Sequence, residues 1–135
     1  MTVLDESQTD IRAILKESLV PGLRTRGFKG SFPHFRRISD SGVHLLTVQL
    51  DKWGTGNFVV EIAKAPLGPV AMPWGETVPA NKLTAHHFVV RHRLGAAEAG
   101  DHWFQAQEFL LDPVTSIGKL LELVDSQGAL WWDGA

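Results

Sequence analysis

Two neighbouring runs of alternating apolar and polar residues constrain the fold of this chain more than any other feature. The runs are VHLLTVQLDKW (43–53) and NFVVEIAKA (57–65), and only Gly-Thr-Gly separates them. Apolar residues at every second position are typical of a strand with one buried face, and a short glycine turn between two such strands predicts an antiparallel hairpin. The chain therefore contains a sheet with an apolar face that must be covered.

Helical patterns lie at the two ends of the chain. Pro21 should end or kink the first helix, because proline lacks the N–H that a helix needs. Asp112 followed by Pro113 is typical of the start of the second helix. Apolar residues recur at spacings of three and four in both patterns, at Ile11, Ile14, Leu15, Leu19 and Leu23 and at Val114, Ile117, Leu120, Leu121, Val124 and Trp131.

Further segments predict strands on either side of the central hairpin. SFPHFRRIS (31–39) precedes it, HHFVVRHRLG (86–95) follows it, and DHWFQ (101–105) would add a short fifth strand. Strands grouped between two helices indicate an α+β fold. We expect residues 1–135 to form one two-layer domain, in which an antiparallel β-meander of four to five strands carries the N- and C-terminal helices on one face.

Composition excludes several classes of function. The chain has no cysteine, which rules out disulfides, thiol nucleophiles and thiolate metal sites. Its net charge of -2 argues against nucleic-acid binding as a function, because a strongly basic surface supplies most of that affinity. The chain has neither a secretory signal pattern nor an apolar run of about twenty residues, so we expect a soluble, cytoplasmic protein without membrane contacts.

Side chains alternate between the two faces of a strand, so the hairpin pattern assigns the faces. If Trp53 pairs with Asn57, Leu50 lies opposite Val60, and the apolar face of the hairpin meets the helices. The same face should include Phe88, Val90 and Leu94 of the fourth strand.

The opposite face, which the helices leave open, mixes apolar and polar groups. It carries Leu45, Thr47, Gln49, Val59, Glu61, His87, Val89, Arg91 and Arg93. The loop at 64–85 holds four of the seven prolines and shows little periodicity, which is typical of a lid, a binding loop or a mobile connection. We expect this loop to cover part of the open face.

Two arginines on the open face indicate a site for an anion. Arg91 and Arg93 lie two residues apart, and two guanidinium groups in that arrangement can bind a carboxylate or phosphate through forked hydrogen bonds. In the alternative reading, one of them pairs with Glu61 and has only a structural role. Arg37 joins the site if the first hairpin turns it to this face, whereas a loop one residue longer would turn Arg36 there instead.

Other polar and aromatic residues complete the predicted ligand site. Gln49 and Glu61 would orient the ligand, and Trp53 or Trp74 would supply an apolar wall. The candidate ligand-binding residues are Arg37, Gln49, Trp53, Glu61, Trp74, His87, Arg91 and Arg93. Adjacent residues of a strand point to opposite faces, so His86 and His87 cannot share a metal, and no HxH or HExxH spacing occurs. We expect no metal and no cofactor.

Three classes of function remain open. The chain has no GxSxG, Walker A or dinucleotide-binding motif, and this absence favours a non-enzymatic binding module for a small anionic ligand. A second reading is a protein-interaction module, such as an immunity or regulatory partner, that uses exposed Trp and Arg side chains. A third is a hydrolase-like enzyme with Glu61 and His87 as the acid–base pair.

The segments RGFKGSFPHFRR, LLTVQLDKWGTGNFVVEIA and RHRLG followed by HWF resemble the DUF4304 family, over roughly residues 10–105. The matching positions are Gly27, Phe28, Phe35, Arg37, Gln49, Phe58, Arg91, Arg93, Leu94, Gly95 and Trp103. This family has no established activity, so the resemblance implies a fold type more than a function. Members often carry an asparagine-like polar residue where this chain has Glu61, which can neutralise one arginine.

Overall fold

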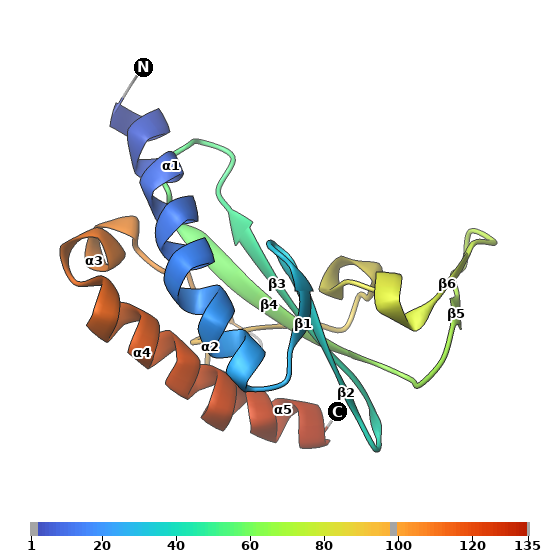
Figure 1. Ribbon diagram of the computed structural model, residues 1–135. Coiled ribbons are helices and arrows are strands. Elements are labelled where there is room, and N and C mark those ends of the chain that lie inside the picture. Colours follow the sequence, from blue (N-terminus) through green and yellow to red (C-terminus); the bar gives the residue numbers. More distant parts are fainter. Residues whose placement is uncertain (1–2, 98–99, 135) are drawn as a thin grey trace.

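The computed structural model describes residues 3–97 and 100–134, and it has an α+β fold with an antiparallel sheet and helices on one face (Figure 1). In spatial order the five strands are β1 (Lys29–Ser31), β2 (His34–Ser39), β3 (Gly42–Leu50), β4 (Phe58–Ala65) and β7 (His92–Arg93). The two-layer meander predicted from the sequence is confirmed. In the described part of the chain, no helix has both the length and the apolar character needed to cross a bilayer.

The helical layer comes from both ends of the chain. The N-terminal part comprises α1 (Val3–Ile14), a π turn η1 (Leu15–Leu19) and α2 (Val20–Thr25); the C-terminal part comprises α3 (Ala106–Leu111), α4 (Pro113–Leu123), a π turn η4 (Val124–Gly128) and α5 (Ala129–Gly134). The Asp112 side chain accepts a hydrogen bond from the Thr115 amide, as expected of an N-cap. The helix does not end at Pro21, because the π turn lies just before it and α2 accepts the proline in its first turn.

The main core lies between the helices and the sheet. Apolar side chains of β2, β3 and β4 meet those of the helices there, and the largest fully buried side chains include Trp132, Phe28, Phe35, Phe58 and Phe109. Leu94 joins this core as predicted, whereas Val90 is 75% exposed and Phe88 packs on the other side of the sheet. Val114 was predicted in the apolar stripe of the last helix, and it is also exposed.

The central hairpin forms with a register that differs by two residues from the predicted one. Leu50 pairs with Phe58, not with Val60. The loop is longer than the glycine turn alone, because the Asp51 side chain accepts a hydrogen bond from the Thr55 amide and closes residues 51–57 into a compact turn. A shift by two residues preserves which side chains share a face, so the face assignment of the hairpin is correct.

The long proline-containing segment is ordered and packs on the face opposite the helices. It forms the short hairpin of β5 (Val70–Ala71) and β6 (Thr77–Val78), followed by the 3-10 turns η2 (Ala80–Lys82) and η3 (Ala85–His87). A second buried cluster joins this segment to the sheet and consists of Val43, Leu45, Ala63, Ala65, Met72, Val78, Leu83 and Ala85. The predicted cover over part of the open face is therefore present.

The fourth predicted strand is mostly not a strand. Only His92 and Arg93 of the segment 86–95 pair with β4, opposite Ile62 and Glu61. The segment begins in η3, because the amide and hydroxyl of Thr84 bond to the ring of His87 and start a helical turn. The predicted fifth strand at 101–105 is reduced to one isolated bridge between Phe104 and Phe58.

Candidate functional site

One row of polar residues crosses the whole sheet on the face away from the helices. Ser31 pairs with His34, His34 with Thr47, Thr47 with Glu61, and Glu61 with Arg93, so the row includes one residue from each of the five strands. Directly paired residues place their side chains on the same face, within contact of one another. His34 Nδ1 lies 2.9 Å from Thr47 Oγ1, and Arg93 Nε donates to Glu61 Oε1 at 3.3 Å. We call these five residues the polar row.

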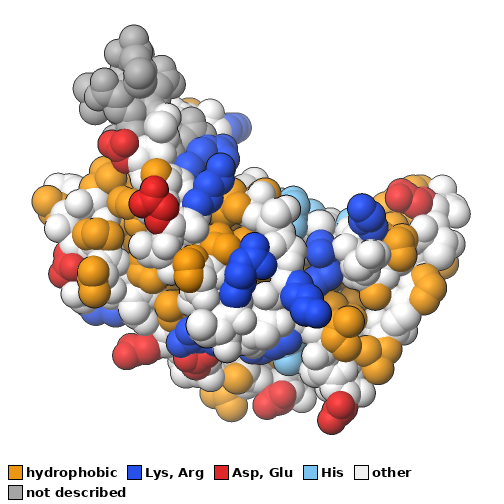
Figure 2. All heavy atoms as spheres, viewed as in Figure 1, with side chains coloured by type: hydrophobic (Ala, Val, Ile, Leu, Met, Phe, Trp, Pro, Cys, Tyr) orange, Lys and Arg blue, Asp and Glu red, His pale blue; other side chains and the backbone are white. Residues whose placement is uncertain are grey.

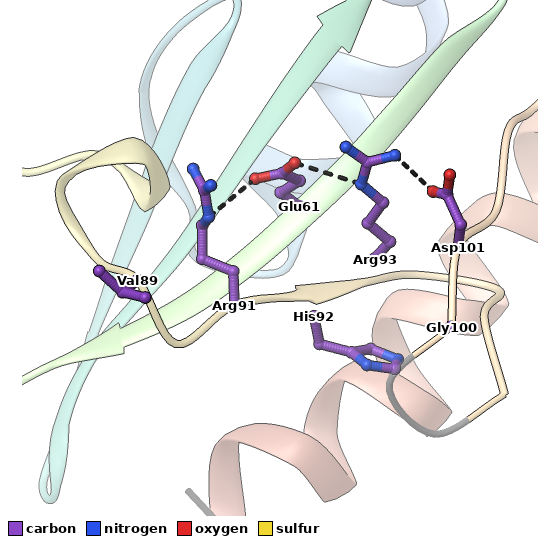
Figure 3. Close-up of a pocket in the computed structure, with 7 residues that line it drawn as sticks. All are labelled: Glu61, Val89, Arg91, His92, Arg93, Gly100 and Asp101. Atoms are coloured by element: carbon purple, nitrogen blue, oxygen red, sulfur yellow. Dashed lines mark hydrogen bonds and ion pairs between the residues drawn. The ribbon is translucent and has the colours of Figure 1, made fainter.

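Glu61 is the buried charge at the centre of this face, with 6% of its side chain exposed. Figure 3 shows one guanidinium on each side of its carboxylate: Arg93 Nε lies 3.3 Å from Oε1 and Arg91 Nε lies 3.2 Å from Oε2. His86 Nε2 approaches the same Oε2 at 3.9 Å. A buried carboxylate needs such partners, because burying an unpaired charge is costly.

The two arginines are not equally engaged. Arg93 also bonds to the exposed side chain of Asp101, and its guanidinium lies 5.5 Å from the centre of the Trp103 ring. The hydrogen bond from Arg93 lowers the pKa of the Asp101 carboxyl. Arg91 contacts Glu61 only as an ion pair without hydrogen-bond geometry, since within the described ranges Glu61 Oε2 accepts no hydrogen bond. The guanidinium N–H groups of Arg91 can therefore still donate hydrogen bonds to a ligand.

A pocket of about 460 Å³ opens at this cluster. Its lining consists of Glu61, Val89, Arg91, His92, Arg93, Gly100 and Asp101 (Figure 3). The lining contains two guanidinium groups and two carboxylates, and the side chain of Arg91 is 35% exposed. Such a pocket can bind a small polar molecule with an anionic group.

The polar row continues from Glu61 toward β2 into a second hollow of about 330 Å³. His34, Thr47, Gln49, Asp51 and His86 are among its lining residues. The rings of His34 and His86 meet edge to face, with centres 5.8 Å apart. Burial lowers the pKa of His34, and the positive charges of His86, Arg36 and His87 add to this effect. Figure 2 shows histidine side chains at the floor of the hollow between the helical layer and the projection that carries β5 and β6.

Arg37 does not belong to this site. It lies on the helix-covered face, where its guanidinium is 4.4 Å from the centre of the Phe28 ring and donates to His44 Nδ1. The first hairpin has the alternative register, in which Arg36 turns to the open face and donates from Nε to the Leu83 carbonyl. The sequence could not fix this register, because a slip of one residue exchanges the two arginines.

His86, not His87, is the histidine beside Glu61. The ring of His87 is 2.9 Å from the Thr84 amide and serves the capping box of η3. A strand over 86–95 would have turned His87 to the face of Glu61. The residues instead form a 3-10 turn, which brings His86 to Glu61. In the described part of the chain, no three His, Asp or Glu side chains form a group that could hold a metal ion.

The two candidate tryptophans stay outside the pocket. Trp53 is 66% exposed in the loop between β3 and β4, and Trp74 is 64% exposed in the loop between β5 and β6. These two loops lie at different ends of the molecule (Figure 1). Gln49, by contrast, lines the second hollow. His92 lies on the helix side of the sheet, where its ring stacks on that of Trp131.

Four residues of the site were not predicted from the sequence: His34, Thr47, His86 and Asp101. Thr47 was assigned to the correct face without a role, and His34 follows from the register of β2. Asp101 and His86 gave no signal in the sequence, because they reach the site from irregular segments.

The family model described as "Domain of unknown function (DUF4304)" matches residues 19–134 of the chain. The match includes the sheet, the segment over its open face and the C-terminal helices α3, α4 and α5. No curated protein and no solved structure matches the chain.

Proposed function

Since the chain belongs to the DUF4304 family, a domain of unknown function, we propose a function from the geometry of the site: the protein is a binding module that accepts an anionic group at Arg91. The ligand is a small molecule with a carboxylate or a similar oxyanion. Glu61 and Arg93 of the polar row line the site, and His86 of η3 lies beside it, 3.9 Å from Glu61.

The unengaged guanidinium of Arg91 is the observation that supports this proposal most strongly. Its Nε lies 3.2 Å from Glu61 Oε2, which holds the group at the pocket. A guanidinium has five N–H donors, and that of Arg91 donates no hydrogen bond within the described ranges. An anion can therefore bind through forked hydrogen bonds without first breaking an existing one.

Arg93 has a different role in this proposal. Glu61 and Asp101 already accept hydrogen bonds from its guanidinium, so fewer of its donors are free for a ligand. It keeps Glu61 in place, and Glu61 in turn positions Arg91. The predicted clamp of two equal arginines is thus replaced by one ligand contact and one positioning residue.

Binding fits this arrangement better than catalysis. Glu61 is held by two guanidinium groups, and its oxygens face those cations. A general base must reach a substrate proton, and only 6% of the Glu61 side chain is exposed between those cations. The neighbouring His86 lies 3.9 Å away, beyond hydrogen-bond distance.

Isothermal titration calorimetry with the carboxylates acetate and succinate tests the proposal. We expect at least one of these probes to bind the native protein, and we expect Arg91→Gln to weaken that binding tenfold or more. Lys119→Gln is the matched control, because it removes one positive charge from α4 in the helical layer. Failure of both probes to bind, or equal binding of them by Arg91→Gln and the native protein, would refute the proposal.

A further inference from the structure

We propose a second anion site, for a phosphate-type oxyanion, at the β1–β2 hairpin, where Lys29 pairs with Arg36 and Arg24 donates to the Gly30 carbonyl. This site lies on the opposite edge of the sheet from Arg91. Three strand spacings, or about 14 Å, separate β2 from β7. The site is therefore independent of the pocket at Glu61 and does not depend on the function proposed for it.

Two positive side chains lie directly opposite each other in this hairpin. Lys29 of β1 pairs with Arg36 of β2. Direct cross-strand partners place their side chains on one face, and like charges in such a pair destabilise a hairpin. A local arrangement that costs stability without a visible gain is a reason to look for a function.

A third positive group joins them from the end of the first helical segment. Arg24 of α2 donates from Nη2 to the Gly30 carbonyl at 3.0 Å. Arg36 approaches the same glycine, since a Cβ built at Gly30 would lie 3.4 Å from its Nη1. Both guanidinium groups therefore lie close to Gly30, Arg24 at its carbonyl and Arg36 at the space that a side chain would fill. Figure 2 shows Lys and Arg side chains gathered on the face over β1 and β2.

Gly30 makes this convergence possible. Its φ of +111° is a conformation that other residues rarely adopt, and a Cβ there would come 2.5 Å from the His34 carbonyl oxygen. Any side chain at this position would shift the hairpin and occupy the space beside Arg36.

None of the three cations has an acidic partner among the side chains that the structure describes. The ion pairs there involve Arg26, His86, Arg91 and Arg93. Arg36 uses Nε for the Leu83 carbonyl, which fixes its stem and leaves Nη1 and Nη2 for a ligand. Burial lowers the pKa of Arg36, and no neighbouring carboxylate counteracts that effect. A guanidinium remains protonated even so, and it gains from an anion that neutralises it.

The shape of the cluster favours phosphate over carboxylate. A carboxylate is planar and is satisfied by one arginine fork. A phosphate presents oxygens in several directions and carries more charge, so it can contact an ammonium and two guanidinium groups that approach from different elements. Lys29 approaches from β1, Arg36 from β2 and Arg24 from α2.

Binding of inorganic pyrophosphate, measured by isothermal titration calorimetry at low ionic strength, tests this second site. We expect Lys29→Gln and Arg36→Gln each to weaken pyrophosphate binding about tenfold. Arg91→Gln and the charge-matched control Lys119→Gln should leave it within twofold. The Lys29 side chain is exposed, so its substitution keeps the test valid if Arg36→Gln fails to fold.

The outcomes separate the two sites. Loss of pyrophosphate binding in Arg91→Gln, with normal binding in Lys29→Gln, would overturn the second site and leave the Arg91 site standing. An equal loss in Lys119→Gln would show that only net charge matters, and it would also overturn the proposal. A failure of the acetate and succinate titrations at Arg91 would leave the second site unaffected.

Discussion

At the scale of single residues, the site depends on how one buried carboxylate is compensated. Glu61 was assigned to the open face from the alternation of apolar residues alone, and this assignment was correct. Arg91 and Arg93 were both expected on this face, with one of them paired to Glu61, whereas His86 was not expected there, because it lies in a 3-10 turn and not in a strand. Strand periodicity carries no information about such segments.

Glu61→Gln should destabilise the protein by about 3 kcal/mol, because it leaves two guanidinium groups beside a neutral side chain in a buried setting. Chemical denaturation monitored by tryptophan fluorescence gives the free energy of unfolding. Asp101→Asn is the matched control and should change it little, because that pair is exposed to solvent. Equal effects of the two substitutions would mean that Glu61 is not the centre of the cluster.

His44 should make the stability depend on pH. Burial, with the nearby charges of Arg37 and Lys64, lowers the pKa of His44 to about 4. The unfolded chain therefore binds more protons between pH 6.5 and 4, so the stability decreases as the pH falls through that range. Between pH 7.5 and pH 5 the loss from His44 should be about 2 kcal/mol, by the linkage relation for this shift.

Urea unfolding at the two pH values measures this loss. His44→Gln keeps a polar side chain beside Arg37 and lacks the titrating ring, so its stability should fall by about 2 kcal/mol less over the same interval. An identical pH dependence in the variant and the native protein would rule out His44 as the source.

At the scale of elements, the helices and the central hairpin could be predicted because each has one strong period. The segment 64–85 could not, because its short strands and 3-10 turns contain too few residues to show a period. Its order depends on contacts that are distant in sequence, such as those of Met72 and Leu83 with the residues of β3 and β4. The helix α3 was not predicted either, because its six residues are too few to show a helical period.

Leu83→Ala should lower the free energy of unfolding by about 3 kcal/mol, because it removes a fully buried side chain from the cluster between this segment and the sheet. Trp74→Ala in the same segment should cost less than about 0.5 kcal/mol, because Trp74 is mostly exposed. Denaturant midpoints of the two variants provide the comparison. Small effects of both would indicate that the segment does not pack on the sheet.

At the scale of the whole molecule, the two ends of the chain meet over the sheet. Trp132 of α5 is fully buried, stacks on His44 of β3 at 4.7 Å between ring centres, and donates to the Ala63 carbonyl of β4 at 2.9 Å. Its ring also lies beside Phe28, which follows α2. Trp131 was predicted in the helical stripe and Trp132 was not, because the π turn at Val124–Gly128 shifts the helical period by one residue.

Trp132→Ala should lower the free energy of unfolding by about 4 kcal/mol, because this side chain joins the helical layer to the sheet. All elements of the variant should still unfold in one transition. Leu130→Ala in the same helix is the control and should have little effect, since Leu130 is 76% exposed. Circular dichroism and fluorescence should report the same midpoint for each protein. Separate midpoints in the native protein would contradict a single cooperative domain.

The most direct test of the Arg91 site is an NMR titration that follows the arginine Nε–H resonances as succinate is added. We predict that the Arg91 resonance moves first and furthest, that Arg93 follows weakly through Glu61, and that Arg37 on the helix-covered face does not move. A saturating titration in which Arg91 stays unchanged, or in which all arginines move alike, would contradict the account.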